Sequence, residues 1–197
     1  MVTDRLTCTT SHDFGDVLEL SRDFGQASGF WGPALPLITG LAVGCGAKQL
    51  LEVGVGRGGS THALLAAAES TDGRLISIDS ADCLGAIPPD RRDRWTFLCG
   101  ESFEVLPILR GPIDFALIDG DHSYQSTLNE LCEMERLLAP GGLVMLDDVW
   151  EPEYRGCLQA FSEFDSSRIE SKQLVRCGVS QSVFGRARTF GLIRFRE

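Results

Sequence analysis

Basic residues and long apolar runs are both scarce in this sequence of 197 residues. It has 18 Lys and Arg residues against 28 Asp and Glu residues, so its formal net charge is −10. Such a charge repels polyanions, and a broad nucleic-acid interface needs clustered basic side chains. No apolar run approaches the roughly 20 residues of a membrane-spanning helix, and the N-terminus lacks the pattern of a secretory signal. We therefore expect a cytoplasmic protein that binds neither nucleic acid nor membranes.

The sequence also lacks any cysteine pair with metal-binding spacing. Its seven cysteines are an odd number, and no two of them form a Cys-x-x-Cys pair. A disulfide framework or a zinc site would normally show such regularity. The pattern favours free thiols in a reducing compartment. The length fits one domain, and a hydrophobic content of 43% is enough for a full core.

The most informative stretch is Leu50–Ser60, with the sequence LLEVGVGRGGS. An apolar run leads into four glycines, and a helical pattern follows, which predicts a strand, a tight turn and a helix. Glycine permits positive φ and close approach of a ligand, and the first N–H groups of a helix have no partner within it. We expect a nucleotide-like ligand here, although a purely structural glycine turn is the alternative.

Strands and helices alternate along the rest of the chain, which predicts a mostly parallel sheet with helices on both faces. The expected helices are Asp13–Ala27, Ala34–Val43, Thr61–Glu69, Phe103–Leu109, Ser126–Leu138 and Glu153–Phe164. The expected strands are Leu50–Val53, Leu75–Ile78, Trp95–Cys99, Ile113–Ile118, Leu143–Leu146, Lys172–Cys177 and Phe190–Phe195. The last two have no clear helix between them, so they can pair antiparallel.

Polar residues follow each of the parallel strands, at the edge of the sheet where ligands bind in open α/β folds. Asp79 follows the second strand, where an acidic residue commonly binds ribose hydroxyls. Glu101 and Ser102 follow the third strand, and Asp119 follows the fourth. Capping of a turn or helix is the structural alternative for Asp79 and Ser102.

Three carboxylates are expected to converge at this edge, because Asp147 and Asp148 end the strand beside the one that Asp119 ends. Such a cluster is repulsive unless a cation is present, and Mg²⁺ prefers oxygen ligands. His122 lies three residues after Asp119, and its ordinary pKa suits a general base. The alternatives are that the aspartates are turn and cap residues without a metal, and that His122 is a surface residue.

In their order and spacing, five segments resemble the class I S-adenosylmethionine-dependent methyltransferases: LLEVGVGRGGST, ISIDS, GESFEVLPIL, FALIDGDHSY and APGGLVMLDDV. More narrowly, they resemble the divalent-metal-dependent O-methyltransferases of small molecules, of the catechol, caffeoyl-CoA and macrolide-sugar types. The resemblance covers roughly residues 48–165. It implies a Rossmann-like, seven-stranded α/β sheet that is mostly parallel, with an antiparallel C-terminal strand. Residues 1–47 would form a helical segment packed on a methyltransferase domain of residues 48–197.

The resemblance also implies two cofactors, S-adenosylmethionine and Mg²⁺ or another divalent cation. The implied cofactor-binding residues are Glu52, Gly54, Gly56, Ser60, Asp79, Glu101, Ser102 and Asp119, with the first three at the methionine part, Asp79 at the ribose, and Glu101 and Ser102 at the adenine. The implied metal ligands are Asp119, Asp147 and Asp148. His122 falls where catechol-type enzymes carry a catalytic lysine. In having a histidine there, the chain is similar to several sugar O-methyltransferases, which use a histidine as the base.

These features predict methyl transfer to a hydroxyl of a small molecule, such as a natural product, a sugar or a phenol, with metal assistance and His122 as the base. A metal-independent methyltransferase of the same fold is one alternative. An NAD-dependent oxidoreductase is another, since Gly54-x-Gly56-x-x-Gly59 and Asp79 fit it, but it leaves the acidic cluster unexplained. A non-catalytic binding protein is a third. Trp150, Tyr124 and Arg155 are candidates for the substrate pocket. The sequence does not decide between a monomer and a homodimer.

Overall fold

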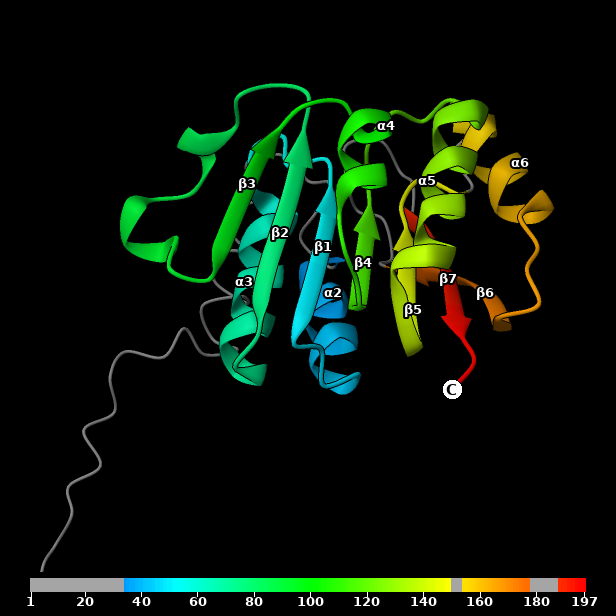
Figure 1. Cartoon of the computed structure of the whole chain (residues 1–197), viewed down its shortest axis with the longest axis horizontal. Coiled ribbons are helices and arrows are strands. Elements are labelled where there is room, and N and C mark those ends of the chain that lie inside the picture. The colour runs from blue at the N-terminus through cyan, green and yellow to red at the C-terminus, as the bar shows by residue number, and fades with distance from the viewer. Residues whose placement is uncertain (1–33, 150–153, 178–187) are drawn as a thin grey trace, which may run out of the picture.

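The computed structural model describes residues 34–149, 154–177 and 188–197, and these contain a seven-stranded sheet of order β3-β2-β1-β4-β5-β7-β6 (Figure 1). The strands from β1 to β5 pair in parallel, whereas β7 runs antiparallel to both β5 and β6. The predicted sheet is thus confirmed, including its antiparallel C-terminal strand. The bounds are β1 Gln49–Val53, β2 Arg74–Asp79, β3 Trp95–Cys99, β4 Ile113–Ile118, β5 Leu138–Leu146, β6 Ile169–Cys177 and β7 Arg188–Phe195.

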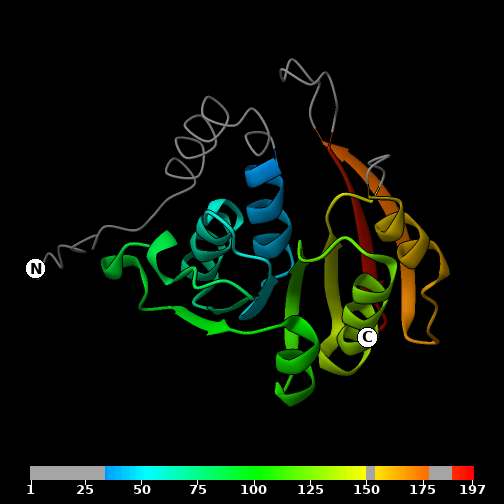
Figure 2. The same ribbon diagram turned by 90° about the horizontal axis from the view of Figure 1, so that it is seen from above.

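Helices cover both faces of the sheet, as Figure 2 shows for α2 and α3 on one side and α4 and α5 on the other. The described helices are α2 Ala34–Gly44, α3 Gly59–Thr71, α4 Ser102–Val105, α5 Tyr124–Leu137 and α6 Arg155–Glu163, with 3₁₀ turns at Leu84–Ala86, Pro89–Arg91 and Leu106–Ile108. In this part of the chain, none of them has the length and hydrophobicity of a membrane crossing. The predicted helix Asp13–Ala27 lies outside the described residues.

The sequence predicts one helix over Phe103–Leu109, but the structure has the short helix α4 followed by a 3₁₀ turn. Pro107 explains the difference, because it has no backbone N–H to donate to the preceding turn and its ring crowds that turn. The strand β5 also begins earlier than predicted, at Leu138 rather than Leu143. Its first residues reach Ile113 of β4 before the register shifts.

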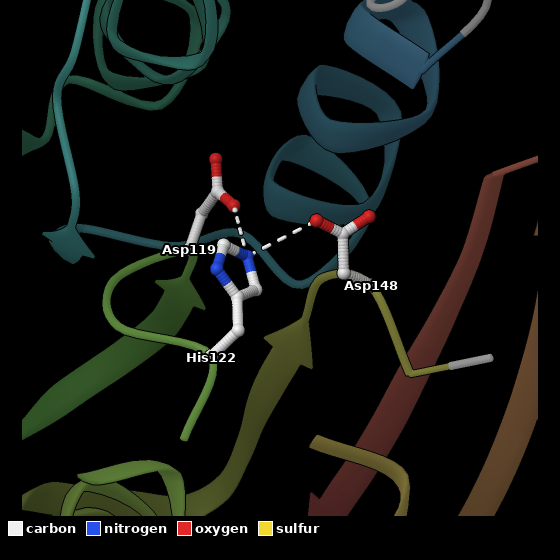
Figure 3. A group of neighbouring side chains, drawn as sticks. All are labelled: Asp119, His122 and Asp148. Carbon is white, nitrogen blue, oxygen red and sulfur yellow. Dashed lines mark ion pairs between the residues drawn. The ribbon is translucent and has the colours of Figure 1, made fainter. Parts of the chain in front are cut away.

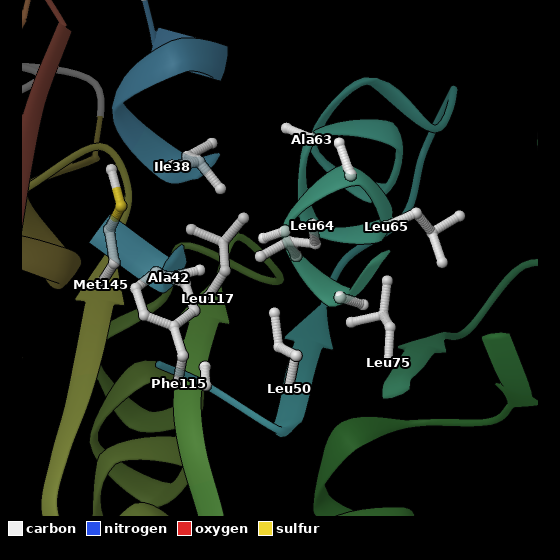
Figure 4. Close-up of a cluster of buried hydrophobic side chains, with 14 of the residues drawn as sticks. Ile38, Ala42, Leu50, Ala63, Leu64, Leu65, Leu75, Phe115, Leu117 and Met145 are labelled. Carbon is white, nitrogen blue, oxygen red and sulfur yellow. The ribbon is translucent and has the colours of Figure 1, made fainter. Parts of the chain in front are cut away.

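Each face of the sheet has its own hydrophobic cluster. Neighbouring residues in a strand point to opposite faces, so Leu50 packs with α2 and α3 (Figure 4), whereas Leu51 packs with α5 and α6. Both side chains are fully buried, as expected for a parallel strand that is covered on both sides. On the first face, the Thr39 hydroxyl of α2 donates a hydrogen bond of 2.9 Å to the Ala63 carbonyl of α3.

The strand order changes direction at β1 and β4, and this places the site. The chain leaves β1 for α3 on one face, whereas it leaves β4 for α5 on the other face. A crevice therefore opens between the carboxyl ends of these two strands, where ligands bind in open α/β sheets. Gly54 follows β1 at this point, and Asp119 follows β4.

Candidate active site

A cavity of about 950 Å³ lies at the carboxyl ends of strands β1 to β4. It is lined by the glycine turn after β1, by the ends of β2 and β3, by the residues after β4 and by the first turns of α5. Seven of the eight predicted cofactor residues line it: Gly54, Gly56, Ser60, Asp79, Glu101, Ser102 and Asp119. The structure therefore brings together residues that are spread over more than sixty positions of the sequence.

The glycine turn has a conformation that side chains would not tolerate. Gly54 has a φ of +91°, and a Cβ at this position would lie 1.9 Å from the carbonyl oxygen of Asp119. Gly56 has a φ of +53°, and a Cβ there would point into open space. Asp79 closes the turn, because its Oδ2 accepts hydrogen bonds from the amides of Val55 at 2.8 Å and Gly56 at 3.0 Å.

Glu52 differs from its predicted place. It is fully buried beneath the glycine turn and does not line the cavity. Its carboxylate accepts hydrogen bonds from the hydroxyls of Ser60 (2.6 Å), Thr61 (2.8 Å) and Ser77 (2.6 Å). Burial raises the pKa of Glu52 to about 7. In this arrangement Glu52 anchors the start of α3 and orients Ser60, instead of contacting the methionine part of a cofactor as predicted.

Beside the cavity, His122 lies between two of the predicted metal ligands (Figure 3). Its Nε2 is 3.0 Å from Asp148 Oδ2 and 3.5 Å from Asp119 Oδ1. The nearby carboxylates of Asp119 and Asp148, which favour the protonated imidazole, raise the pKa of His122 to about 10, despite its partial burial. The imidazole also stacks on Tyr154, with ring centroids 4.1 Å apart.

Asp147 is not part of this group, although the sequence predicts it as a metal ligand. Its buried carboxylate forms an ion pair with Arg188, in which Arg188 Nε lies 2.7 Å from Asp147 Oδ1 and Nη2 contacts Oδ2. Among the described residues, the possible ligand atoms that all lie within 4.8 Å of one another come from Asp119, His122 and Asp148. Of the three aspartates, the structure therefore brings two together with His122 and directs the third to an arginine.

Two charged residues of the site were not predicted from the sequence. Glu130 of α5 lines the cavity, is 2% exposed and accepts a hydrogen bond of 2.7 Å from the Ser102 hydroxyl. Burial raises its pKa to about 7. Ser126, Asn129, Glu130 and Glu133 repeat at helical spacing, and this polar face is the one signal that could have indicated Glu130. Arg188 carried no such signal, because its approach to Asp147 depends on strand pairing.

The three pocket candidates are placed differently. The hydroxyl of Tyr124 donates a hydrogen bond of 2.7 Å to Glu163 and does not line the cavity. Arg155 is exposed at the start of α6. Trp150 lies outside the described residues. Tyr154, which the sequence did not single out, contacts His122 instead.

Comparison with known proteins places this site in a family. Residues 51–149 match the family described as a methyltransferase domain. TomG, an O-methyltransferase of tomaymycin synthesis from Streptomyces achromogenes, was solved with S-adenosylmethionine; it has a TM-score of 0.70 and 19% identity over 98% of this chain and 93% of that chain. An O-methyltransferase from Bacillus cereus, solved with S-adenosylhomocysteine, has a TM-score of 0.67 and 18% identity over 98% and 94%.

A third solved structure, the cofactor-bound Rv0187 from MTB, has a TM-score of 0.67 and 22% identity over 82% of this chain and 78% of that chain. At these identities the solved structures show a shared fold. No curated protein matches the chain in sequence. The family match spans half of the chain and includes the glycine turn and the acidic strand ends. The chain therefore belongs to this methyltransferase domain family, and its predicted resemblance to the class I S-adenosylmethionine-dependent methyltransferases is confirmed.

Proposed function

We propose that this chain is an S-adenosylmethionine-dependent O-methyltransferase that methylates a hydroxyl of a small molecule. The observation that carries the proposal is the position of His122, 3.0 Å from Asp148 and 3.5 Å from Asp119, where Asp119 also lines the cavity. An imidazole held between two carboxylates thus lies beside the cavity in which a methyl donor fits. The net charge of −10 disfavours a polyanionic acceptor and supports a small one.

The cavity suits the proposed cofactor in its volume and in the residues that line it. Its volume of about 950 Å³ is at the upper end of ordinary ligand pockets. Gly56 leaves open space where a side chain would enter it, and Ser60, Asp79 and Ser102 supply polar groups along its wall. Gly56 and Ser60 would lie at the methionine part of the cofactor, Asp79 at the ribose and Ser102 at the adenine. When bound, the cofactor supplies an electrophilic methyl group.

The role of His122 is to accept the proton of the substrate hydroxyl at Nε2. The carboxylates of Asp119 and Asp148 then stabilise the imidazolium, as acidic partners do for a histidine base. The two neighbouring carboxylates raise the pKa of His122, so the imidazole must lose its proton before Nε2 can act as the base. The ring of Tyr154 stacks on the imidazole and holds its plane.

A metal-assisted form of the same reaction is the second candidate. One observation favours it, since ligand atoms of Asp119, His122 and Asp148 lie within 4.8 Å of one another. Two carboxylates and an imidazole suit Mn²⁺, Fe²⁺ or Zn²⁺ better than Mg²⁺, which prefers oxygen ligands. In that form His122 is a ligand, and Nε2 is not free to act as the base. The sequence-based expectation combined a bound Mg²⁺ with His122 as the base. These two features now belong to separate proposals, since His122 is the base in one form and a metal ligand in the other.

Calorimetric titration with S-adenosylhomocysteine, with NAD as a control, tests the cofactor. We expect binding of the homocysteine compound, loss of binding in Asp79→Asn, and no change in the exposed control Asp90→Asn. Binding of NAD instead would support the oxidoreductase alternative. Methyl transfer to a panel of sugars and phenols, with and without EDTA, separates the two forms. Activity that survives EDTA supports His122 acting alone, whereas activity lost in EDTA and restored by Mn²⁺ supports the metal-assisted form.

A further inference from the structure

Arg188 is a buried cation at the centre of the acidic strand ends. Its side chain is 8% exposed, and it contacts both carboxylate oxygens of Asp147. Its Nη2 also lies 3.9 Å from Asp148 Oδ1 and 4.0 Å from Asp119 Oδ1. All three aspartates that the sequence predicts as metal ligands therefore face the same guanidinium group.

A network of contacts runs from Arg188 to the imidazole of His122. Asp147 Oδ1, which accepts from Arg188 Nε, also accepts a hydrogen bond of 2.8 Å from the backbone amide of Asp148. Asp148 has a φ of +54°, a left-handed conformation that is unusual for a residue other than glycine. In this conformation its Oδ2 lies 3.0 Å from His122 Nε2. Arg188 thus fixes Asp147, and Asp147 fixes the backbone that aims Asp148 at His122.

A positive charge stabilises converging carboxylates, since they repel one another and lose hydration when buried. A guanidinium provides this charge as a divalent cation would, because it is always charged and its planar fork pairs with two oxygens at once. We propose that Arg188 takes the place of a divalent cation at Asp147 and serves as the permanent counter-charge of Asp119, Asp147 and Asp148. Divalent cations then bind this edge weakly in the native chain.

This inference deepens the proposed function, on which its catalytic meaning rests. Under it, Arg188 is a positioning residue that acts on the substrate through Asp148 and His122. The guanidinium supports the metal-independent form of the reaction, because the charge that a metal would provide at the carboxylates is already present. It also explains why the sequence motif of the metal-dependent enzymes can be retained without the same metal site: the aspartates keep a cationic partner of another kind.

Titration with Mn²⁺ in the absence of cofactor tests the substitution of charge. We compare the native chain with Arg188→Met, Arg188→Lys and the double variant Arg188→Met/Asp147→Asn. We expect Arg188→Met to bind Mn²⁺ about tenfold more tightly or better, because a repulsive cation is removed and a carboxylate is freed. Arg188→Lys keeps the charge and should stay near the native affinity. The double variant should lose the gain, and the exposed ion pair of Arg94 with Asp72 supplies the control Arg94→Met.

Native binding of Mn²⁺ that is stoichiometric and no weaker than that of Arg188→Met would overturn the proposal. If Arg188→Met does not fold alone, its recovery in the presence of Mn²⁺ and not in buffer supports the proposal. In that case Asp147→Asn in the native background is decisive: unchanged Mn²⁺ affinity agrees with Arg188 occupying Asp147, and a marked loss contradicts it. Titration of the native chain with S-adenosylhomocysteine tests the proposed function separately. The role of Arg188 and the proposed function can therefore fail independently of each other.

Discussion

A Cβ on Gly54 would lie 1.9 Å from the carbonyl oxygen of Asp119, so the ends of β1 and β4 approach as closely as a bare backbone allows. This approach joins the glycine turn to the residues that lead to His122. The same glycine has a φ of +91°. Both the contact and the conformation exclude a side chain, and both lie at the wall of the cavity.

We predict that Gly54→Ala lowers the free energy of unfolding by about 2–4 kcal/mol, because backbone strain adds to a clash with a backbone oxygen. Urea unfolding measures the loss, and titration with S-adenosylhomocysteine should show weaker binding. Gly46→Ala is the matched control, since Gly46 also has a positive φ, +62°, but has nothing within 4 Å of its Cβ position. Equal losses in the two variants would show that the clash with Asp119 contributes nothing.

The buried carboxyl of Glu52 predicts a stability that depends on pH. Its pKa is about 7 in the folded chain against an ordinary value of 4.5, so between these values the folded state binds more protons than the unfolded state. The free energy of unfolding should therefore fall as pH rises from 4.5 to 7, by at most about 3 kcal/mol, and stay level above pH 7.

Glu52→Gln should remove this contribution, because an amide does not titrate. We expect urea unfolding at pH 5 and pH 8 to show a smaller difference for the variant than for the native chain. The free energy of unfolding of Glu52→Gln should still depend on pH, since the pKa of Glu130 is also raised to about 7. Glu69→Gln, a change of a partly exposed glutamate in α3, serves as the control. An identical pH dependence in the native chain and Glu52→Gln would mean that Glu52 ionises normally.

The hydrogen bond from Ser102 to Glu130 predicts a coupled loss of stability and binding. Ser102→Ala removes the donor at 2.7 Å from a carboxyl that is 2% exposed, and leaving a buried acceptor poorly satisfied costs about 1–3 kcal/mol. Urea unfolding should show this loss, and the affinity for S-adenosylhomocysteine should fall as the cavity wall rearranges. Ser162→Ala, which removes an exposed hydroxyl bonded to the Leu158 carbonyl, should change stability by less than about 0.5 kcal/mol.

The proposed base predicts a separation of binding from turnover. His122→Gln should lower the rate of methyl transfer by about 10²–10⁴ if His122 takes the proton, while the affinity for S-adenosylhomocysteine changes little. Mass spectrometry of the methylated acceptor gives the rate, and calorimetry gives the affinity. Tyr124→Phe is the control, since its hydroxyl bonds Glu163 outside the cavity. A variant that binds and methylates like the native chain would remove His122 from the mechanism.

The sequence predicts the parts of the fold that have local signals. Leu50 and Leu51 lie in an apolar run before Gly54, and this run is strand β1 in the structure. The order of acidic residues after the strands likewise indicates where the cavity lies. Such features follow from strand periodicity and from turn residues, which act over a few positions.

Other features depend on contacts between distant segments and could not be predicted. Glu52 is directed away from the cavity because three hydroxyls meet it beneath the glycine turn, one of them Ser77 from the neighbouring strand. Arg188 reaches Asp147 because the register of β5 and β7 places Leu146 beside Gly191. Neither the register nor the direction of a buried carboxylate is written in a local pattern.

The reversed direction of β7 has a consequence for how such a site can change. In a parallel strand, the last residue lies at the catalytic edge of the sheet, whereas in β7 it is the first, Arg188, that arrives there. The charge at this edge can therefore be altered by one substitution at a strand terminus, leaving the apolar residues of the strand in place. Under the proposal above, substitution of Arg188 alone converts an acidic cluster with its own guanidinium into one that needs a bound metal ion as its counter-charge.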